Sequence, residues 1–135
     1  MRIRLDVRSY FLTAVISVIG FIFPPSQLIA QDTHFHNAPP SSVGQKNPYA
    51  GQSTAVAAGS RLYATNCGSC HGIKGRGTAN VPPLSKGATE SASDGEVFWF
   101  ITTGAADKGM PSWASLPERQ RWQIVTYLKS LKSPA

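Results

Sequence analysis

The spacing of apolar residues indicates a helix over residues 55–66. Val56, Gly59, Leu62 and Tyr63 recur at intervals of three and four, which places them on one face of a helix. Gly59 is unusual there, because glycine inside a helix costs about 0.5–1 kcal/mol relative to alanine. We therefore expect another helix to pack closely against this one at Gly59.

A second helix is predicted over residues 93–103. Ser93 and Glu96 match the S-x-x-E capping box that begins many helices, and Gly104 is typical of a helix end. The residues between them are apolar on nearly every face. A short helix of that kind is expected to be buried.

The last predicted helix opens at a second capping box, Ser115 to Glu118, and runs to about Leu131. Its apolar positions follow the i, i+3, i+4, i+7 spacing of one helix face: Ile124, Tyr127, Leu128 and Leu131. This face is expected to pack into the core.

Two segments have no helical spacing. Residues 31–53 are rich in Gln, Asn, Pro, Ser and Gly, which is typical of a flexible linker or a loosely docked arm. His34 and His36 lie there and are interpreted as a solvated pair, with adventitious metal binding as the alternative. Residues 71–92 are interrupted by Gly and Pro, so they predict a long loop. A loop of that length in a small domain needs a large object to wrap.

The N-terminal residues 1–30 have the pattern of a secretory signal peptide. Three arginines precede a near-continuous apolar run over residues 10–23, a Pro-Pro pair ends the run, and Ala30 offers a cleavage point. The run is too short for a comfortable membrane span. Leu28 is larger than the usual residue at its position before the cleavage point, so an uncleaved membrane anchor stays the alternative.

Charge adds little to this picture. The chain has 13 Lys and Arg against 7 Asp and Glu, and removal of residues 1–30 leaves a formal charge near +4. A modest basic bias suits steering toward an acidic partner. The basic residues are scattered, without a stripe or motif of nucleic-acid recognition, so no nucleic acid is expected as a partner.

The candidate chemistry lies in Cys67-Gly68-Ser69-Cys70-His71, the C-x-x-C-H pattern that attaches a c-type haem. Each thiol can form a thioether with a haem vinyl group, and His71 is placed to bind the iron. Three alternatives stay open. A thioredoxin-like pair needs a surrounding βαβ pattern, a zinc site needs two further ligands, and an exported pair could form a disulfide. The adjacent histidine favours haem.

Met110 is the candidate for the sixth iron ligand. It is the only methionine besides Met1, and Gly109 and Pro111 flank it in a loop between two predicted helices. A lone methionine more often fills a gap in a core. A thioether is nevertheless a soft ligand that suits the open position of an iron already bound by His71. The predicted metal ligands are therefore His71 and Met110.

Residues from about 54 to 132 resemble a class I c-type cytochrome, the soluble monohaem family, of bacterial periplasmic type. The resemblance rests on Gly59-x-x-x-Tyr63-x-x-x-Cys67, the C-G-S-C-H pentapeptide, the Met110 loop and the W-x-I-V-x-Y-L pattern of the last helix. It implies an all-α cytochrome c fold over residues 54–135. In this fold, three to four helices wrap around one haem c, bound covalently through Cys67 and Cys70.

The resemblance also implies how the ends of the domain meet. The first and last helices would cross, with Gly59 and Tyr63 against Ile124 and Tyr127. It further implies that a proline carbonyl after the haem motif accepts a hydrogen bond from the proximal histidine, and Pro82 matches that position, with Pro83 as the alternative.

These readings predict an exported monohaem carrier of single electrons with His/Met ligation and no enzymatic activity. The expected partners are redox proteins: a periplasmic dehydrogenase as donor, and a terminal oxidase or another cytochrome as acceptor. This pairing is by family analogy. The expected location is periplasmic or secreted, with no stable membrane span once the signal peptide is cleaved and membrane anchoring if it is not. The alternative is a haem enzyme or sensor with an open sixth site, similar to a peroxidase.

Overall fold

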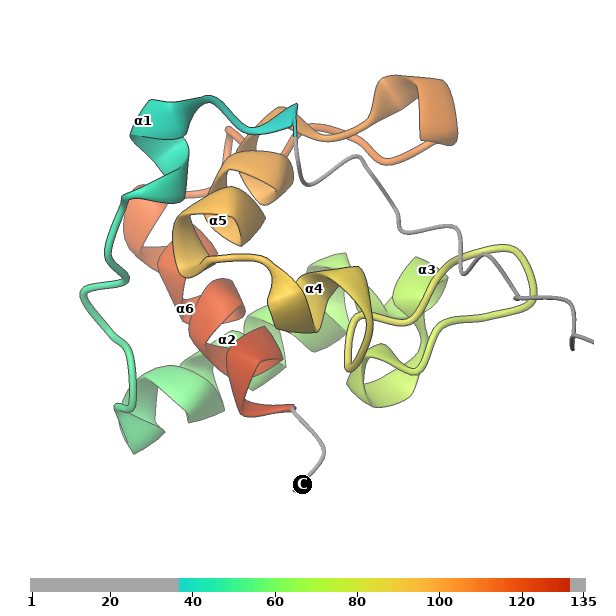
Figure 1. The fold of residues 1–135 in the computed structure, drawn as a ribbon. Helices are drawn as coiled ribbons and strands as arrows, with labels where there is room; N and C mark the ends of the chain where they lie inside the picture. Colours follow the sequence, from blue (N-terminus) through green and yellow to red (C-terminus); the bar gives the residue numbers. More distant parts are fainter. Residues whose placement is uncertain (1–36, 132–135) are drawn as a thin grey trace, which may run out of the picture.

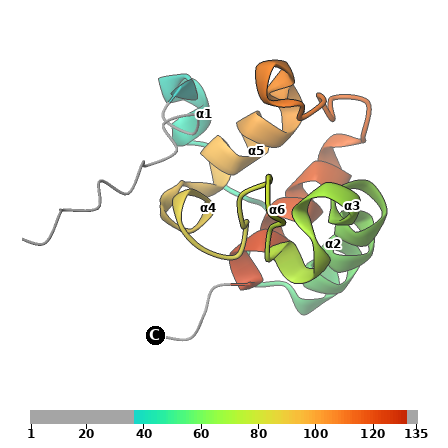
Figure 2. The same cartoon turned by 90° about the vertical axis from the view of Figure 1, so that its right-hand side faces the viewer.

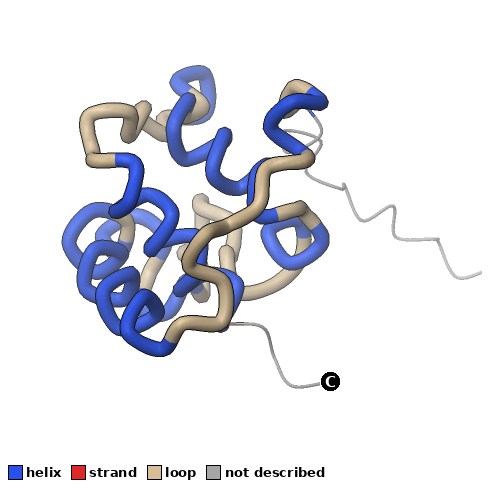
Figure 3. Tube along the Cα trace, turned by 90° about the vertical axis from the view of Figure 1, so that its left-hand side faces the viewer, coloured by secondary structure: helices blue, strands red, loops and turns tan. Residues whose placement is uncertain are grey.

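The computed structural model describes residues 37–131, and within that range it is built from helices and loops (Figures 1 and 3). The only β pairing among these residues is one isolated bridge, between Ala105 and Met110. The expected all-α fold is confirmed. The predicted signal peptide, His34 and His36 lie outside the described residues. The elements are α1 (Pro40–Val43), α2 (Ser53–Asn66), α3 (Gly68–His71), the 3₁₀ helix η2 (Ile73–Gly75), α4 (Ala88–Ser91), α5 (Asp94–Thr103), the 3₁₀ helix η3 (Ala106–Lys108) and α6 (Glu118–Ser130).

Helices α2 and α6 cross closely at Gly59 (Figures 1 and 2). A Cβ atom on Gly59 would lie 2.0 Å from the backbone oxygen of Gln123 and 2.8 Å from the Cβ atom of Tyr127. Four residues on, the ring centroids of Tyr63 and Tyr127 are 5.3 Å apart. The expected contact with Tyr127 is therefore present. The closest neighbour of Gly59 is the backbone of Gln123, whereas Ile124 points into the core.

The core is centred on α6. Ile124 and Val125 are 1% and 0% exposed, and Tyr63 from α2 and Val97 from α5 are each 2% exposed. These side chains form one cluster, which joins the three longer helices. Burial of contiguous apolar surface of this kind supplies most of the stability of a small domain.

Helix α5 begins at the predicted capping box. Glu96 N–H donates to Ser93 Oγ at 3.2 Å, and Ser93 N–H donates to a carboxylate oxygen of Glu96 at 2.6 Å. Burial of α5 differs from the prediction. Val97 and Ile101 are buried, but the aromatic residues between them are half-buried. Only one face of α5 therefore packs into the protein core.

Helix α6 begins later than the second capping box predicted. Its first residue is Glu118, Pro117 occupies the N-cap position, and no side chain caps the helix. The prediction failed because a residue before proline is disfavoured in the helical region, which keeps Leu116 out of the helix. The Glu118 carboxylate instead accepts a hydrogen bond from Trp122 Nε1 at 3.3 Å.

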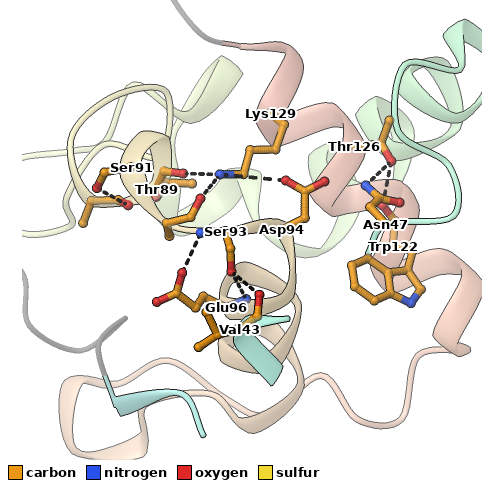
Figure 4. Close-up of polar contacts among 12 residues, drawn as sticks. Val43, Asn47, Thr89, Ser91, Ser93, Asp94, Glu96, Trp122, Thr126 and Lys129 are labelled. Atoms are coloured by element: carbon orange, nitrogen blue, oxygen red, sulfur yellow. Dashed lines mark hydrogen bonds and ion pairs between the residues drawn. The ribbon is translucent and has the colours of Figure 1, made fainter. Parts of the chain in front are cut away.

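The N-terminal segment, residues 37–52, packs against the helices where a flexible linker or arm was expected. Helix α1 lies beside α5, and Ser93 Oγ donates to the carbonyl of Val43 at 3.0 Å (Figure 4). Asn47 Nδ2 donates to Thr126 Oγ1 in α6, also at 3.0 Å. Proline at the first position of a helix favours α1 locally. The segment thus touches both α5 and α6.

The predicted loop over residues 71–92 contains two short turns of helix, η2 and α4. Lys129 of α6 fixes the end of α4, because its ammonium donates to the carbonyls of Thr89, at 3.0 Å, and of Ala92 (Figure 4). The same ammonium lies 4.0 Å from a carboxylate oxygen of Asp94 in α5. No helix in the described part of the chain is long and apolar enough to cross a membrane.

Candidate functional site

The C-x-x-C-H motif continues directly from the end of α2. Cys67 N–H donates to the carbonyl of Tyr63 at 2.8 Å, and His71 N–H donates to the carbonyl of Cys67 at 2.9 Å. Cys67 therefore lies at the end of α2, and Cys70 and His71 lie on the next helical turn, α3. The backbone hydrogen bonds leave this stretch little conformational freedom. The Tyr63 hydroxyl donates to the carbonyl of Gly72 at 2.9 Å and ties α2 to the residue after His71.

Both thiols are free, with Cys67 half-buried and Cys70 exposed. Burial raises the pKa of Cys67 to about 11, and the neighbouring Cys70 adds to that increase. The Cys67 thiol is therefore protonated at neutral pH. A redox-active C-x-x-C pair uses a thiol with a lowered pKa, so this environment does not favour the thioredoxin-like alternative.

The ring of His71 faces the carbonyl of Pro82, with Nδ1 and the oxygen 3.4 Å apart. The contact involves Pro82 and not Pro83. Burial lowers the pKa of His71, and the contact with the Pro82 carbonyl opposes part of that decrease. A neutral imidazole that donates through Nδ1 keeps a lone pair on Nε2, which is the form that binds a metal.

The loop that carries Pro82 folds back onto the motif through backbone hydrogen bonds. Gly77 N–H donates to the carbonyl of His71 at 2.8 Å, and Leu84 N–H donates to that of Gly75 at 2.7 Å. Gly72 has a positive φ of 72°, and a Cβ atom there would lie 2.7 Å from the Gly77 oxygen. This close approach explains why the loop needs glycine and how Pro82 reaches His71.

Met110 lies on a separate loop that returns to the end of α5. Ala105 and Met110 exchange two backbone hydrogen bonds, of 2.9 and 3.0 Å, and Gly109 turns the chain between them with a φ of 79°. Ser112 Oγ then donates to the carbonyl of Thr102 at 2.6 Å. The backbone of Met110 is thus fixed beside the end of α5, and Met110 is half-buried.

The donor set fits a covalently attached iron porphyrin. It offers two thiols that can form thioether bonds to the porphyrin, and an imidazole and a methionine sulfur of the kinds that haem iron takes as ligands. Zinc is a poorer fit, because the described residues contain no group of three or more His, Cys, Asp or Glu side chains that could hold a metal ion.

The structure brings four of the predicted site residues together in one region: Cys67, Cys70, His71 and Pro82. Met110 lies on the loop after α5, paired with Ala105, and within residues 37–131 no hydrogen bond joins it to these four residues. Sequence reasoning missed the hydroxyl of Tyr63, which was assigned to helix packing alone. Its place four residues before Cys67 was the available signal, since residues four apart share a helix face.

Comparison with known proteins gives a consistent result. The model of the family described as cytochrome c oxidase, cbb3-type, subunit III matches residues 54–128, more than half of the chain. The matched range covers the C-x-x-C-H motif, the Pro82 loop and Met110.

Two individual proteins are similar over 57% of this chain. A cytochrome bc1 complex cytochrome c subunit from Corynebacterium diphtheriae is 32% identical over 77 residues, which is 27% of that protein's length. The crystal structure of the c-type cytochrome XoxG from Methylobacterium extorquens AM1 superposes with a TM-score of 0.51 at 21% identity, over 50% of its own chain. The chain thus spans about a quarter of its curated relative and half of its structural neighbour, whose likeness supports the cytochrome c fold.

Proposed function

The chain belongs to the family described as cytochrome c oxidase, cbb3-type, subunit III, and it is a class I c-type cytochrome with covalently bound haem c; we propose that it carries single electrons between exported redox proteins. Within this proposal the chain holds one haem, because its two cysteines suffice for one attachment. It acts as a carrier, without substrate turnover of its own.

The observation that supports this proposal most is the contact between His71 and Pro82. The Pro82 carbonyl orients the ring through Nδ1 and makes Nε2 a better donor to iron. Burial lowers the pKa of His71, which favours the neutral imidazole that a metal ion needs as a ligand. His71 would therefore hold the haem iron through Nε2.

Met110 is the second axial ligand in this proposal. The Ala105–Met110 bridge fixes the backbone of Met110, and a thioether that stays bound to iron would reorganise little when the iron charge changes. When bound, the haem supplies an iron that cycles between Fe(II) and Fe(III). Thioether ligation and exclusion of water both favour the reduced state and raise the potential.

The partners follow from the chemistry and from the relatives. One relative is named as the cytochrome c subunit of a cytochrome bc1 complex, and the structural neighbour is named as a c-type cytochrome. We place this chain between a periplasmic dehydrogenase as donor and a terminal oxidase or another cytochrome as acceptor. The signal-peptide pattern of residues 1–30 supports a periplasmic or secreted location.

The test is ligand replacement at Met110 in the holoprotein. Met110→Ala should abolish the weak long-wavelength absorption band of methionine bound to ferric haem. The potential should fall by on the order of 0.1 V, a modest part of the range of about 0.8 V that axial ligands set. The reduced variant should also bind carbon monoxide readily, unlike the wild type. An unchanged band would remove Met110 from the iron, and a high-spin wild-type protein would favour an enzyme or sensor.

A further inference from the structure

A polar groove lies between α2 and α6, beside the haem-attachment motif. It has a volume of about 310 Å³ and is lined by Arg61, Thr65 and Asn66 from α2, and by Arg119, Gln120 and Gln123 from α6. Both helices are rigidly placed, because their backbones meet at Gly59. The groove is therefore a fixed feature of the fold.

The groove contains two arginines and no acidic residue. Arg61 and Arg119 come from different helices, and neither guanidinium has a hydrogen bond or ion pair within residues 37–131. The other lining groups are neutral amides, a hydroxyl and apolar atoms. Two like charges that face one groove without a counter-charge repel each other, and an anion placed between them removes that repulsion.

A second groove contains an arginine whose guanidinium has hydrogen-bond partners within the fold. That groove contains Arg121, whose side chain donates to the carbonyl of Leu116 and to Thr102 Oγ1 and covers the ring of Phe98. Glu118, which neighbours Arg119 in the chain, also lines this second groove. Its carboxylate accepts a hydrogen bond from Trp122 and lies outside the lining of the groove of Arg61 and Arg119.

The position of the groove suits contact with an electron-transfer partner. Asn66 lines it and is followed directly by Cys67, so the groove lies one residue from the haem attachment point. A protein anchored there would hold its own redox centre near the haem of this chain. Guanidinium groups pair with carboxylates through two parallel hydrogen bonds, which fixes orientation as well as position.

We propose that the groove of Arg61 and Arg119 binds a carboxylate side chain of the protein that exchanges electrons with this cytochrome. The inference rests on the proposed carrier function and adds the chemistry of the partner: an acidic residue at the centre of its docking face. The formal charge near +4 for the chain after residue 30 assists the approach of such a face, and the groove gives it a defined register.

The test is an NMR titration of the ¹⁵N-labelled holoprotein with a hexaglutamate peptide at low salt. The side-chain Nε–Hε signals of Arg61 and Arg119 should shift together along one binding curve. Arg61→Gln and Arg119→Gln should each weaken binding by about 5–10-fold, as expected for a shared charge-assisted contact. The double variant should lose little more affinity for the peptide than either single variant loses, because both arginines hold the same carboxylate.

Lys86→Gln is the matched control, since Lys86 is exposed and lies outside the groove. It removes the same charge and should leave the affinity within about twofold. Equal weakening by the control, or shifts that spare the two arginines, would overturn the groove as a site. The absorption spectrum and potential of each variant are read separately, so failure of the carrier function is distinguished from failure of the docking inference.

Discussion

At the scale of single residues, Tyr63 links helix packing to the haem motif. Its ring packs near that of Tyr127, and its hydroxyl donates to the carbonyl of Gly72, directly after His71. Burial raises its pKa to about 12 from an ordinary value of 10.0, so the fold favours the neutral phenol. The stability that the neutral phenol of Tyr63 contributes is therefore complete below pH 10 and is lost as the pH rises through about 12.

Tyr63→Phe should lower the free energy of unfolding of the holoprotein by about 1 kcal/mol at pH 8, because the Gly72 carbonyl loses its donor. The difference in the free energy of unfolding between the variant and the wild type should narrow at pH 11. At that pH the unfolded wild type ionises at Tyr63 while the folded protein keeps the phenol neutral, which lowers the stability of the wild type. Urea unfolding at the two pH values measures both. Tyr49→Phe is the control, since the Tyr49 hydroxyl makes no hydrogen bond within the described residues. A pH-independent difference would contradict this role.

Local residue chemistry predicted some features of the fold and failed at others. The capping box of Ser93 and Glu96 was correct because it needs only four consecutive residues. The equivalent box at Ser115 failed because Pro117 restricts the residue before it. The contact of Pro82 with His71 followed only from family resemblance, since spacing alone does not say which of two prolines faces the ring.

At the scale of elements, the crossing of α2 and α6 depends on the absence of a side chain at Gly59. Glycine lowers the intrinsic stability of α2, so the packing must more than offset that cost. The backbone oxygen of Gln123 occupies the position that a Cβ atom would need, at 2.0 Å. The crossing also sets the direction in which α2 delivers Cys67 to the site.

Gly59→Ala should therefore destabilise the holoprotein by more than about 2 kcal/mol, although alanine is the better helix former. Gly59→Leu should prevent accumulation of holoprotein altogether. Thermal unfolding and the yield of haem-bound protein measure the two effects. Gly44→Ala is the control, because nothing lies within 4 Å of the added Cβ atom and φ at Gly44 is −78°. Normal stability of Gly59→Ala would disprove the close crossing.

The N-terminal segment is the element that sequence patterns described least well. A four-residue helix cannot show an apolar period, and its stability comes from contacts with distant residues. One such contact is very close: a Cβ atom on Gly95 would lie 1.9 Å from the carbonyl oxygen of Ser42. Gly95 thus lets the backbone of α1 rest on the first turn of α5.

Gly95→Ala should displace α1 while leaving α5 helical, because alanine is compatible with a helix but not with the Ser42 carbonyl. Amide hydrogen exchange in residues 37–46 should speed up by at least about tenfold, as expected when a local contact opens more easily. Exchange in α6 should change little. Unaltered protection of residues 37–46 against hydrogen exchange would mean that the packing of this segment does not depend on Gly95.

At the scale of the whole molecule, the sequence predicted the longer helices better than the way in which the elements pack together. Helical spacing identified α2 and α6, the capping box of Ser93 and Glu96 identified α5, and the C-x-x-C-H motif predicted the attachment point. The aromatic residues of α5 were expected to pack in the core or beside a haem, and they are half-buried where full burial was expected. Phe98 and Phe100 pack against the core cluster from the side, and Phe98 stacks on Trp122 with the ring centroids 4.0 Å apart.

The cofactor also explains the size of the domain. About 80 residues from α2 to α6 bury limited apolar surface by themselves, and small domains commonly need a cofactor or cross-link to be stable. Covalent attachment through Cys67 and Cys70 would supply both.

The most direct test of the carrier function is a spectroelectrochemical titration of the purified holoprotein. The account predicts one reversible one-electron transition, with low-spin, six-coordinate haem in both oxidation states. His71 and Met110 would then remain bound throughout. A high-spin ferric state, or a change of coordination between the two states, would contradict the carrier and favour a haem enzyme or sensor.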